Sequence, residues 1–353
     1  MGNKVLMKGN EALAEAAIRC GCRFFFGYPI TPQTELAAYM AKKMIKSGGT
    51  FLQAESEIAA INMVYGAAGA GARVMTSSSS PGISLKQEGI SYIAGADLPC
   101  VIVNIVRGGP GLGGIQPAQS DYFQATKGGG HGDYHLLVYA PSSVQELADL
   151  ISKAFDKADE YRMPAMIMGD GMLGQMMEPV EFKEPISPED LPEKEWATTG
   201  TKMKRKKNII NSLYLTPEEL EDLNIKRYQR YDVVKRNEVM CEEYLTGDAD
   251  IIIAAYGTIA RIAMSAVDMA RQKGIKAGLI RPITLWPFPE EAFKKYADSA
   301  KCFLSVEMSM GQMVEDVRLA VNGKAPVYFY GRTGGMVPEQ EEILAKIEEH
   351  ANA

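Results

Sequence analysis

The sequence predicts an α/β protein with two domains, the larger of which is a doubly wound parallel sheet. Three observations lead to this fold class. Short apolar runs alternate with amphipathic helical segments through residues 1–180, the alternation stops over 181–244, and it restarts over 245–353. Such alternation is typical of parallel sheets with helices packed on both faces. A chain of 353 residues is also long enough for two domains.

The elements of the first domain follow from apolar periodicity and helix caps. In chain order they are a helix over 10–21, strands over 24–26 and 51–54, a helix over 56–72, a strand over 74–76, a helix over 83–94, strands over 100–106 and 136–139, a helix over 142–158 and a strand over 165–168. Pro32 suits the first position of a further helix with Thr31 as N-cap, because proline has no N–H to leave unbonded there. The glycines and alanines of the 56–72 helix predict close packing against a partner.

Residues 181–244 are predicted to form a charged, proline-containing linker with only short helical fragments. The second domain is smaller and again alternates strands with helices. Its strands are expected over 251–255, 277–280, 302–306 and 327–329, and its helices over 259–273, 289–296, 312–320 and 339–349.

Four polar blocks stand where strand-like runs of the first domain end. They are Gly27-Tyr-Pro-Ile-Thr-Pro32, Glu55-Ser-Glu57, Thr76-Ser-Ser-Ser-Ser-Pro-Gly82 and Arg107, which precedes a glycine-rich loop. In open α/β sheets, ligands bind beyond the carboxyl ends of the strands. If these runs are neighbouring parallel strands, the four blocks meet at one edge, and this edge is the candidate site.

Each residue of these blocks also has a plain structural explanation. A carboxylate such as Glu57 is favoured at a helix N-terminus by roughly 0.3–1 kcal/mol. Thr31 is an ordinary N-cap residue, and Arg107 has Asp121 as a possible ion-pair partner. The shared position of the blocks at strand ends is what favours a functional interpretation.

Composition and motifs exclude several classes of function. The net charge of −6 argues against nucleic-acid binding, which needs a basic face. No run approaches the ~20 apolar residues of a membrane span, and the first residues lack a signal-peptide pattern, so we expect a cytoplasmic protein without membrane contact. Five cysteines without paired spacing support no disulfide, zinc site or iron–sulfur cluster. His131 and His135 lie in a glycine loop, and we predict no metal in this chain.

These blocks resemble the alpha-type subunit of the 2-oxoacid:ferredoxin oxidoreductases. Such thiamine-diphosphate enzymes convert a 2-oxo acid, CoA and oxidised ferredoxin to acyl-CoA, carbon dioxide and reduced ferredoxin. The resemblance spans nearly the whole chain and also includes the blocks 119–121, 281–289, 307–312 and 331–338. It implies a pyrimidine-binding domain of the thiamine-diphosphate type, followed by a transketolase C-terminal-like domain.

The resemblance implies roles for individual residues. Glu57 matches the carboxylate that hydrogen-bonds N1′ of the aminopyrimidine and favours its imino tautomer, so that the ring's own amine deprotonates the thiazolium C2. Thr31 and Arg107 match residues near the carboxylate and keto oxygen of the substrate, which suits a helix N-terminus and a guanidinium. The same blocks assign further residues to the cofactor, namely Tyr28, Pro29, Ser79 and Ser80.

The resemblance also implies partner subunits. Gly169-Asp170-Gly171 looks like the start of a diphosphate-binding motif, but the Asn pair that completes the motif is missing, so we interpret these residues as a turn. The diphosphate and its Mg²⁺ are expected on a separate beta subunit. A gamma subunit, a ferredoxin-like delta subunit with iron–sulfur clusters, and ferredoxin are the further expected partners, and the isolated chain should be inactive.

Substrate choice depends on two blocks. The 2-oxoglutarate branch tends to have Thr-Ser-Gly-Pro-Gly and Arg-Pro-Gly-Pro-Ser-Thr-Gly, whereas this chain has Ser78-Ser-Ser-Pro-Gly82 and Arg107-Gly-Gly-Pro-Gly-Leu-Gly113. The difference favours branched-chain acids such as 2-oxoisovalerate, with 2-oxoglutarate as the alternative. A hypothesis of another class is a non-catalytic scaffold subunit. A stand-alone transketolase-like enzyme is disfavoured because the chain lacks the diphosphate motif.

Overall fold

The computed structural model describes residues 4–351. The first domain is built around a seven-stranded sheet. Its strand order is β12-β6-β7-β5-β4-β2-β3. The bounds are β2 Phe24–Gly27, β3 Thr50–Gln53, β4 Val74–Ser78, β5 Cys100–Val106, β6 Leu137–Tyr139, β7 Pro164–Asp170 and β12 Thr284–Trp286. Every neighbouring pair is parallel except β12 with β6. Both faces of a parallel sheet are covered, and β4, β5 and β7 are accordingly buried along their whole length.

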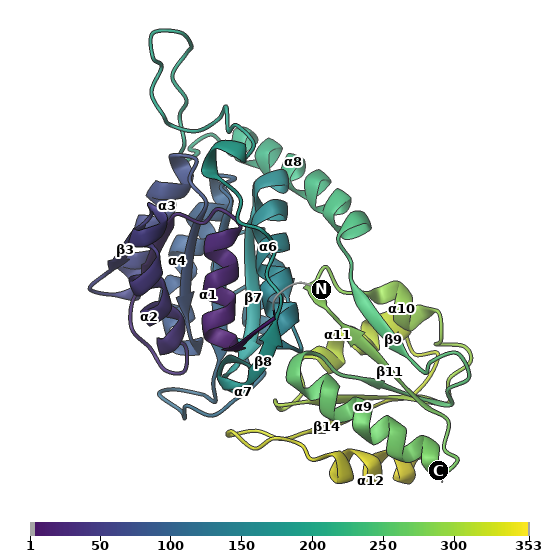
Figure 1. Ribbon diagram of the computed structural model, residues 1–353. Coiled ribbons are helices and arrows are strands. Elements are labelled where there is room, and N and C mark those ends of the chain that lie inside the picture. The colour runs from purple at the N-terminus through teal and green to yellow at the C-terminus, as the bar shows by residue number, and fades with distance from the viewer. Residues whose placement is uncertain (1–3, 352–353) are drawn as a thin grey trace.

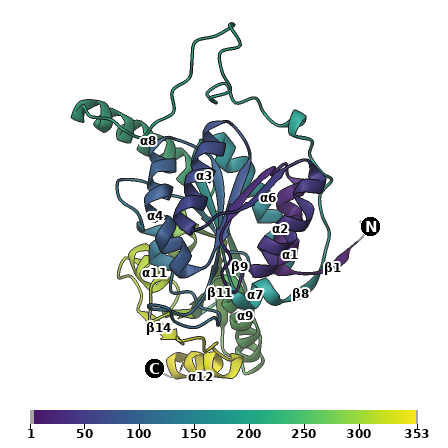
Figure 2. The same cartoon turned by 90° about the vertical axis from the view of Figure 1, so that its left-hand side faces the viewer.

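Helices cover both faces of this sheet (Figures 1 and 2). One layer holds α1 Gly9–Arg19, α2 Thr34–Lys43 and α6 Val144–Tyr161, and the other holds α3 Glu57–Gly69 and α4 Ser80–Gly95. Shorter elements are η1 Ile45–Ser47, α5 Tyr122–Thr126 and α7 Gly171–Gln175. At the rim, β1 Val5–Lys8 pairs antiparallel with β8 Met177–Val180. Apart from the rim strands, this layered arrangement is the doubly wound α/β fold that the sequence predicts.

The second domain is a smaller α/β unit around a five-stranded sheet of order β14-β13-β10-β11-β9. Its strands are β9 Cys241–Tyr244, β10 Ile251–Ala254, β11 Ala277–Pro282, β13 Cys302–Glu307 and β14 Val327–Gly331. Its helices are α9 Gly257–Gln272, α10 Glu290–Lys294, α11 Met313–Val321 and α12 Gln340–Ala351. Helices α9 and α12 pack together over one apolar core. Nowhere within residues 4–351 does a helix combine the length and apolar character needed to cross a bilayer.

The segment between the two sheets differs from the expectation. After η2 Pro188–Asp190 the chain runs as an extended arm and then forms α8, a helix of 21 residues over Pro217–Asn237, where we expected only short helical fragments (Figure 1). Charged residues hide its helical period, because only Arg227, Tyr231 and Val234 are buried. The helix is tied to the first domain where Arg227 and Arg230 bind Asp97, at 3.2 and 2.7 Å.

Strands β9 and β12 show where the second domain begins and how the two domains are joined. Strand β9 already belongs to the second sheet, ahead of residue 245, where the second domain was expected to begin. Strand β12 leaves the second domain and adds itself to the first sheet, with Thr284 opposite Tyr139. Close by, Arg281 forms a bidentate ion pair with Glu146 of α6, at 2.9 and 3.0 Å. The two domains therefore share a strand as well as a linker.

An aromatic cluster closes the contact between α8 and the edge of the first sheet. The ring of His135 stacks on Trp286 of β12, with centroids 4.5 Å apart and planes 17° apart. Tyr228 and Tyr231 of α8 contact the same imidazole. Burial, together with the charges of Lys235 and Lys127, lowers the pKa of His135 to about 4.

We expect the free energy of unfolding to fall between pH 6.5 and 4 because of His135. Its ordinary pKa is about 6.5, so as the pH falls the unfolded chain takes up the proton first and is stabilised. The lost stability should be about 2 kcal/mol. In a series of denaturant titrations across this range, His135→Phe, which retains an aromatic ring but does not titrate, should lose less stability than the parent. Equal losses would show that His135 does not carry the effect.

Candidate active site

The four blocks meet at one edge of the seven-stranded sheet. The strand register places Gly27 beside Gln53, Ser78 beside Asn104, and Val106 beside Asp170. The carboxyl ends of β2, β3, β4 and β5 therefore lie in one row, as the sequence predicted, and the end of β7 lies beside that of β5. Each block emerges from this row as a loop or a helix start.

Glu57 is the first residue of α3, and the Ser56 side chain caps this helix by accepting from the Ala59 N–H at 3.1 Å. The Glu57 side chain is only 7% exposed. Its carboxylate makes no hydrogen bond or ion pair with another residue of the described chain. Buried polar groups are nearly always hydrogen-bonded. A carboxylate without a protein partner at the edge of a sheet can accept a hydrogen bond from the N–H group of a ligand.

Glycines of α4 bring it close to α3. A Cβ atom at Gly82 would lie 2.7 Å from Oε1 of Glu57 and 2.1 Å from Oγ of Ser78. One at Gly89 would lie 2.4 Å from Cγ2 of Ile61. The close packing expected of α3 is therefore found, but it depends on glycines of α4. Gly66 of α3 itself faces open space, with no atom within 4 Å of its ideal Cβ position.

Sequence reasoning missed Lys86, a completely buried residue of α4. Its Nζ donates to Oγ1 of Thr76 at 2.9 Å. Burial lowers the pKa of Lys86 to about 8, and the charge of Glu57 acts in the opposite direction. A signal existed in the sequence, because Lys86 has the helical spacing of the buried Ile83 and Ile90. A lysine on an apolar stripe indicates either strain or function.

Arg107 follows β5 and is held there by hydrogen bonds of both its side chain and its backbone. Its Nη1 donates to the carbonyl of Thr31 at 2.9 Å and its Nη2 to the carbonyl of Leu112 at 3.3 Å, while its backbone N–H donates to Oγ of Ser80 at 3.1 Å. Its buried Nε makes no hydrogen bond. The suggested pairing with Asp121 is wrong, since that carboxylate accepts from Nδ2 of Asn104 at 2.9 Å. The guanidinium thus spans the loops after β2 and β5.

Thr31 is not a helix N-cap, contrary to the prediction. Helix α2 begins at Thr34, and Gln33 precedes it as the cap residue. Pro32, which follows a cis peptide bond, therefore does not occupy the first helical position. Thr31 is instead an exposed loop residue whose carbonyl binds Arg107. The structure places it beside Arg107, but without a helix N-terminus behind it.

The remaining predicted cofactor residues differ in exposure. Tyr28 and Pro29 are exposed on the loop after β2, and Ser80 is half-buried. Ser79 is completely buried, and its hydroxyl, like that of Ser78, has no hydrogen-bond partner. A buried glutamine that the sequence did not suggest orders this region, because Gln33 accepts from the Ser77 hydroxyl at 2.6 Å.

The second domain borders the same edge. Gln119 donates its backbone N–H to the carbonyl of Met308 at 2.8 Å and its side-chain amide to that of Tyr256 at 3.0 Å. Gly335 lies so near Gln116 that a Cβ atom there would come within 2.4 Å of the glutamine Cβ. Asp170 caps α7 and accepts from the Thr258 hydroxyl at 2.6 Å. The Gly-Asp-Gly sequence therefore starts a short helix at the domain contact.

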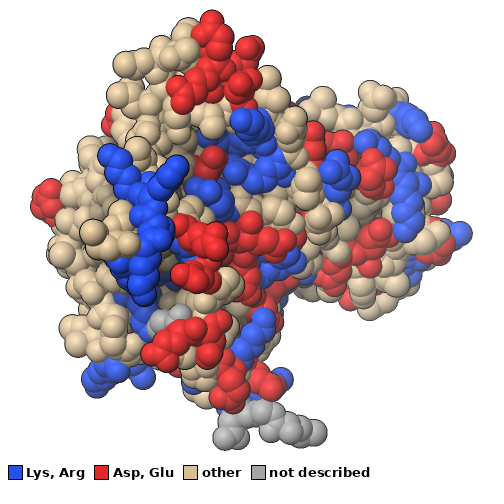
Figure 3. Space-filling view, turned by 90° about the horizontal axis from the view of Figure 1, so that it is seen from above, with Lys and Arg blue, Asp and Glu red and all other residues tan. Residues whose placement is uncertain are grey.

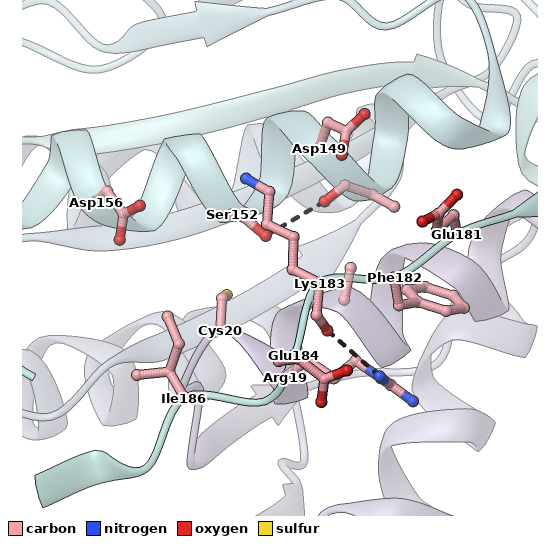
Figure 4. Close-up of a pocket in the computed structure, with 12 residues that line it drawn as sticks. Arg19, Cys20, Asp149, Ser152, Asp156, Glu181, Phe182, Lys183, Glu184 and Ile186 are labelled. Carbon is pink, nitrogen blue, oxygen red and sulfur yellow. Dashed lines mark hydrogen bonds between the residues drawn. The ribbon is translucent and has the colours of Figure 1, made fainter. Parts of the chain in front are cut away.

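Two hollows in the described part of the chain are lined by residues other than Glu57. One lies between α1, α6 and the segment Glu181–Ile186, and its cavity volume of about 50 Å³ is too small for a cofactor (Figure 4). A wider groove of about 840 Å³ lies between the domains and is lined by Lys235, Trp286 and Lys295, among others. Basic and acidic side chains are interspersed over much of the face seen in Figure 3, and one column of basic side chains runs down its left side.

Comparisons with known proteins match both domains. Residues 15–242 match the family described as pyruvate flavodoxin/ferredoxin oxidoreductase, thiamine diphosphate-binding, and residues 249–343 match pyruvate:ferredoxin oxidoreductase core domain II. The ketoisovalerate oxidoreductase subunit VorB of Methanothermobacter marburgensis is 51% identical, with 98% of this chain and 97% of VorB covered. The 2-oxoglutarate synthase subunit KorA of the same organism is 38% identical, with 98% and 99% covered.

A solved structure of a 2-oxoglutarate:ferredoxin oxidoreductase from Magnetococcus marinus, with 2-oxoglutarate, coenzyme A and succinyl-CoA bound, superposes with a TM-score of 0.88 at 28% identity. The match covers 99% of this chain and 66% of that longer chain. A split-gene transketolase matches with a TM-score of 0.61 at 14% identity, which shows a shared fold.

Proposed function

Because the chain belongs to the 2-oxoacid:ferredoxin oxidoreductase family, as a subunit with that family's thiamine-diphosphate-binding domain, we propose that its complex oxidises branched-chain 2-oxo acids, 2-oxoisovalerate foremost. The 2-oxo acid and CoA yield acyl-CoA and carbon dioxide, and two electrons pass to ferredoxin. The observation that carries the proposal is the open, nearly buried carboxylate of Glu57 at the common strand edge.

The side chains at this edge fit thiamine diphosphate. Glu57 offers acceptors with no partner in the described chain, and the hydroxyls of Ser78 and Ser79, which follow at the end of β4, make no hydrogen bond within that part of the chain either. When bound, the cofactor supplies the carbanion chemistry. Glu57 accepts the hydrogen bond of the pyrimidine N1′, and Tyr28, Pro29, Ser79 and Ser80 complete this part of the pocket. Its diphosphate and Mg²⁺ belong to the beta subunit in this proposal.

Thr31 and Arg107 are assigned to the carboxylate and keto oxygen of the substrate. The two carbonyl contacts of Arg107 immobilise the guanidinium, and its Nε is left without a partner. A fixed cation at the end of β5 is suited to an anionic substrate. Thr31 lies next to it, so both residues act from one side of the site.

Two observations favour a branched-chain acid over 2-oxoglutarate. The VorB relative is more similar than the KorA relative, at 51% against 38% identity. Leu112, which lies on the glycine loop held by Arg107, is 85% exposed. An exposed leucine beside a substrate-binding arginine offers apolar surface to an aliphatic side chain, whereas a second carboxylate gains nothing from it.

Anaerobic viologen reduction by the complex co-purified on this chain tests the substrate. With CoA present, we expect kcat/KM for 2-oxoisovalerate to exceed that for 2-oxoglutarate at least tenfold, because an apolar pocket rejects a carboxylate. The reverse preference would leave the reaction type in place and contradict the branched-chain assignment. Omission of CoA from the same complex is the matched control.

The exposed sides of α3 and α4 are proposed to bind the beta subunit. Ile58 on α3 and Leu85 and Tyr92 on α4 are 50%, 52% and 37% exposed, and Gly66 opens the α3 surface between helical turns. Exposed apolar side chains on neighbouring helices mark a protein interface. The gamma subunit, the ferredoxin-like delta subunit with iron–sulfur clusters, and ferredoxin complete the assembly.

Gly66→Trp should prevent co-purification of the beta subunit, because a large side chain would stand on the surface that the partner covers. The chain itself should fold, since the position is open in the isolated chain. Gly66→Ala is the matched control and should assemble normally. Size-exclusion chromatography of the co-expressed subunits shows whether the two subunits elute together. Normal assembly of the Gly66→Trp variant would show that the interface lies elsewhere.

A further inference from the structure

Lys86 is a buried cation that the proposed mechanism leaves without a role. Its side chain is 0% exposed on α4, between the helix and the sheet. Removing an ammonium from water costs several kcal/mol, and a lone neutral hydrogen bond does not offset that cost. The bond to Thr76 is the only one the amine makes within the described chain. A further interaction must therefore stabilise the charged amine at this buried position.

The groups around Lys86 identify Glu57 as its electrostatic partner. Strand β4 contributes the uncharged Thr76 hydroxyl, and α3 contributes the charged Glu57, which acts to raise the pKa of the Lys86 amine against the effect of burial. Gly82 lies four residues before Lys86, so both are on one face of α4. Glu57 packs on Gly82, and Lys86 follows one helical turn further along the same face of α4.

We propose that Lys86 is a positioning residue, whose buried charge holds the Glu57 carboxylate in the place where it accepts the hydrogen bond of the pyrimidine nitrogen of thiamine diphosphate. The inference rests on the proposed function of Glu57. A buried charge acts on a neighbouring carboxylate more strongly than the same charge in water, so it restricts where that carboxylate lies. Lys86 itself touches neither cofactor nor substrate.

Thiamine diphosphate titrated into the cofactor-stripped complex tests this role. Lys86→Met should weaken binding about tenfold at pH 7 and change the near-ultraviolet circular dichroism of the bound cofactor, which reports the protonation of its ring. The affinities of the parent and the variant should converge above pH 8. There the Lys86 amine of the parent loses its proton, and its charge no longer acts on Glu57. A merely structural lysine would produce a difference that is constant with pH.

A double-mutant cycle assigns the effect to Glu57. In a Glu57→Gln background, Lys86→Met should cause no further loss of affinity, because no carboxylate remains to be held. An equal loss in both backgrounds would overturn the inference. If Glu57→Gln alone changes neither affinity nor turnover, the proposed function fails instead, so the two failures can be told apart.

Two further variants keep the test decisive. If Lys86→Met does not fold, Thr76→Val removes the hydrogen bond that orients the amine and should lower the affinity in the same pH-dependent way. Unchanged affinity in that variant would contradict the inference. Lys194→Met is the matched control, because this largely buried lysine pairs with Asp159, near Arg73 and away from the strand edge that holds Glu57. It should leave cofactor binding unchanged.

Discussion

Glu57→Ala is expected to lower kcat by ~10²–10⁴-fold, the range that a positioned acid–base group contributes. The carboxylate is the group that touches the cofactor in the proposed site, and it has no hydrogen-bond or ion-pair partner within the described chain. Assembly should be intact, because Glu57 makes no hydrogen bond or ion pair within the described chain. Ferredoxin or viologen reduction measures kcat, and size-exclusion chromatography confirms assembly.

The same variant separates an enzyme from a scaffold. A non-catalytic subunit has no need of a carboxylate at this position, so Glu57→Ala would leave the activity of the complex unchanged. Glu57→Gln is the control for shape, since it preserves the size of the side chain and removes only its charge. We expect Gln to be nearly as inactive as Ala.

Glu307→Ala is expected to destabilise the second domain by ~3–5 kcal/mol, the cost of breaking a buried charged network. Glu307 is 0% exposed at the end of β13. Its two carboxylate oxygens accept five hydrogen bonds at 2.8–3.0 Å, from the Ser305 and Ser309 hydroxyls and the backbone N–H groups of Gln312, Met313 and Val314. Alanine would remove the shared acceptor of all five donors, most of which are buried.

Thermal unfolding of the assembled protein, followed by a probe in the second domain, measures this loss. Glu315→Ala is the matched control on the first turn of the same helix, where an exposed carboxylate is worth only ~0.3–1 kcal/mol. A loss for Glu307→Ala no larger than that of the control would show that water replaces the carboxylate.

The common strand edge was predictable because it depends on local patterns. The buried strand β5 ends at Val106, and the helix after Ser56 begins at Glu57, as the apolar runs and caps indicated. Parallel neighbours then bring the blocks together without knowledge of any side-chain contact. Family resemblance, and not geometry, was needed to assign chemistry to Glu57.

Long-range contacts explain what the sequence could not predict. The start of α2 at Thr34 is set by the loop that Arg107 and Gln33 hold, and not by the local preference of Thr31 and Pro32. Helix α8 is mostly exposed, so its sequence carries little apolar period. Lys86 was overlooked because its partners lie on β4 and α3.

Strand β12 has a consequence for biosynthesis. Residues Thr284–Trp286 cover the outer edge of β6, which is otherwise the last strand of the first sheet. A nascent chain cannot complete that sheet until residue 286 has left the ribosome, and until then the buried strand β6 presents an unpaired edge. A gene truncated after the linker would therefore yield an aggregation-prone product. To be expressed as a separate polypeptide, the first domain would need a replacement for this strand.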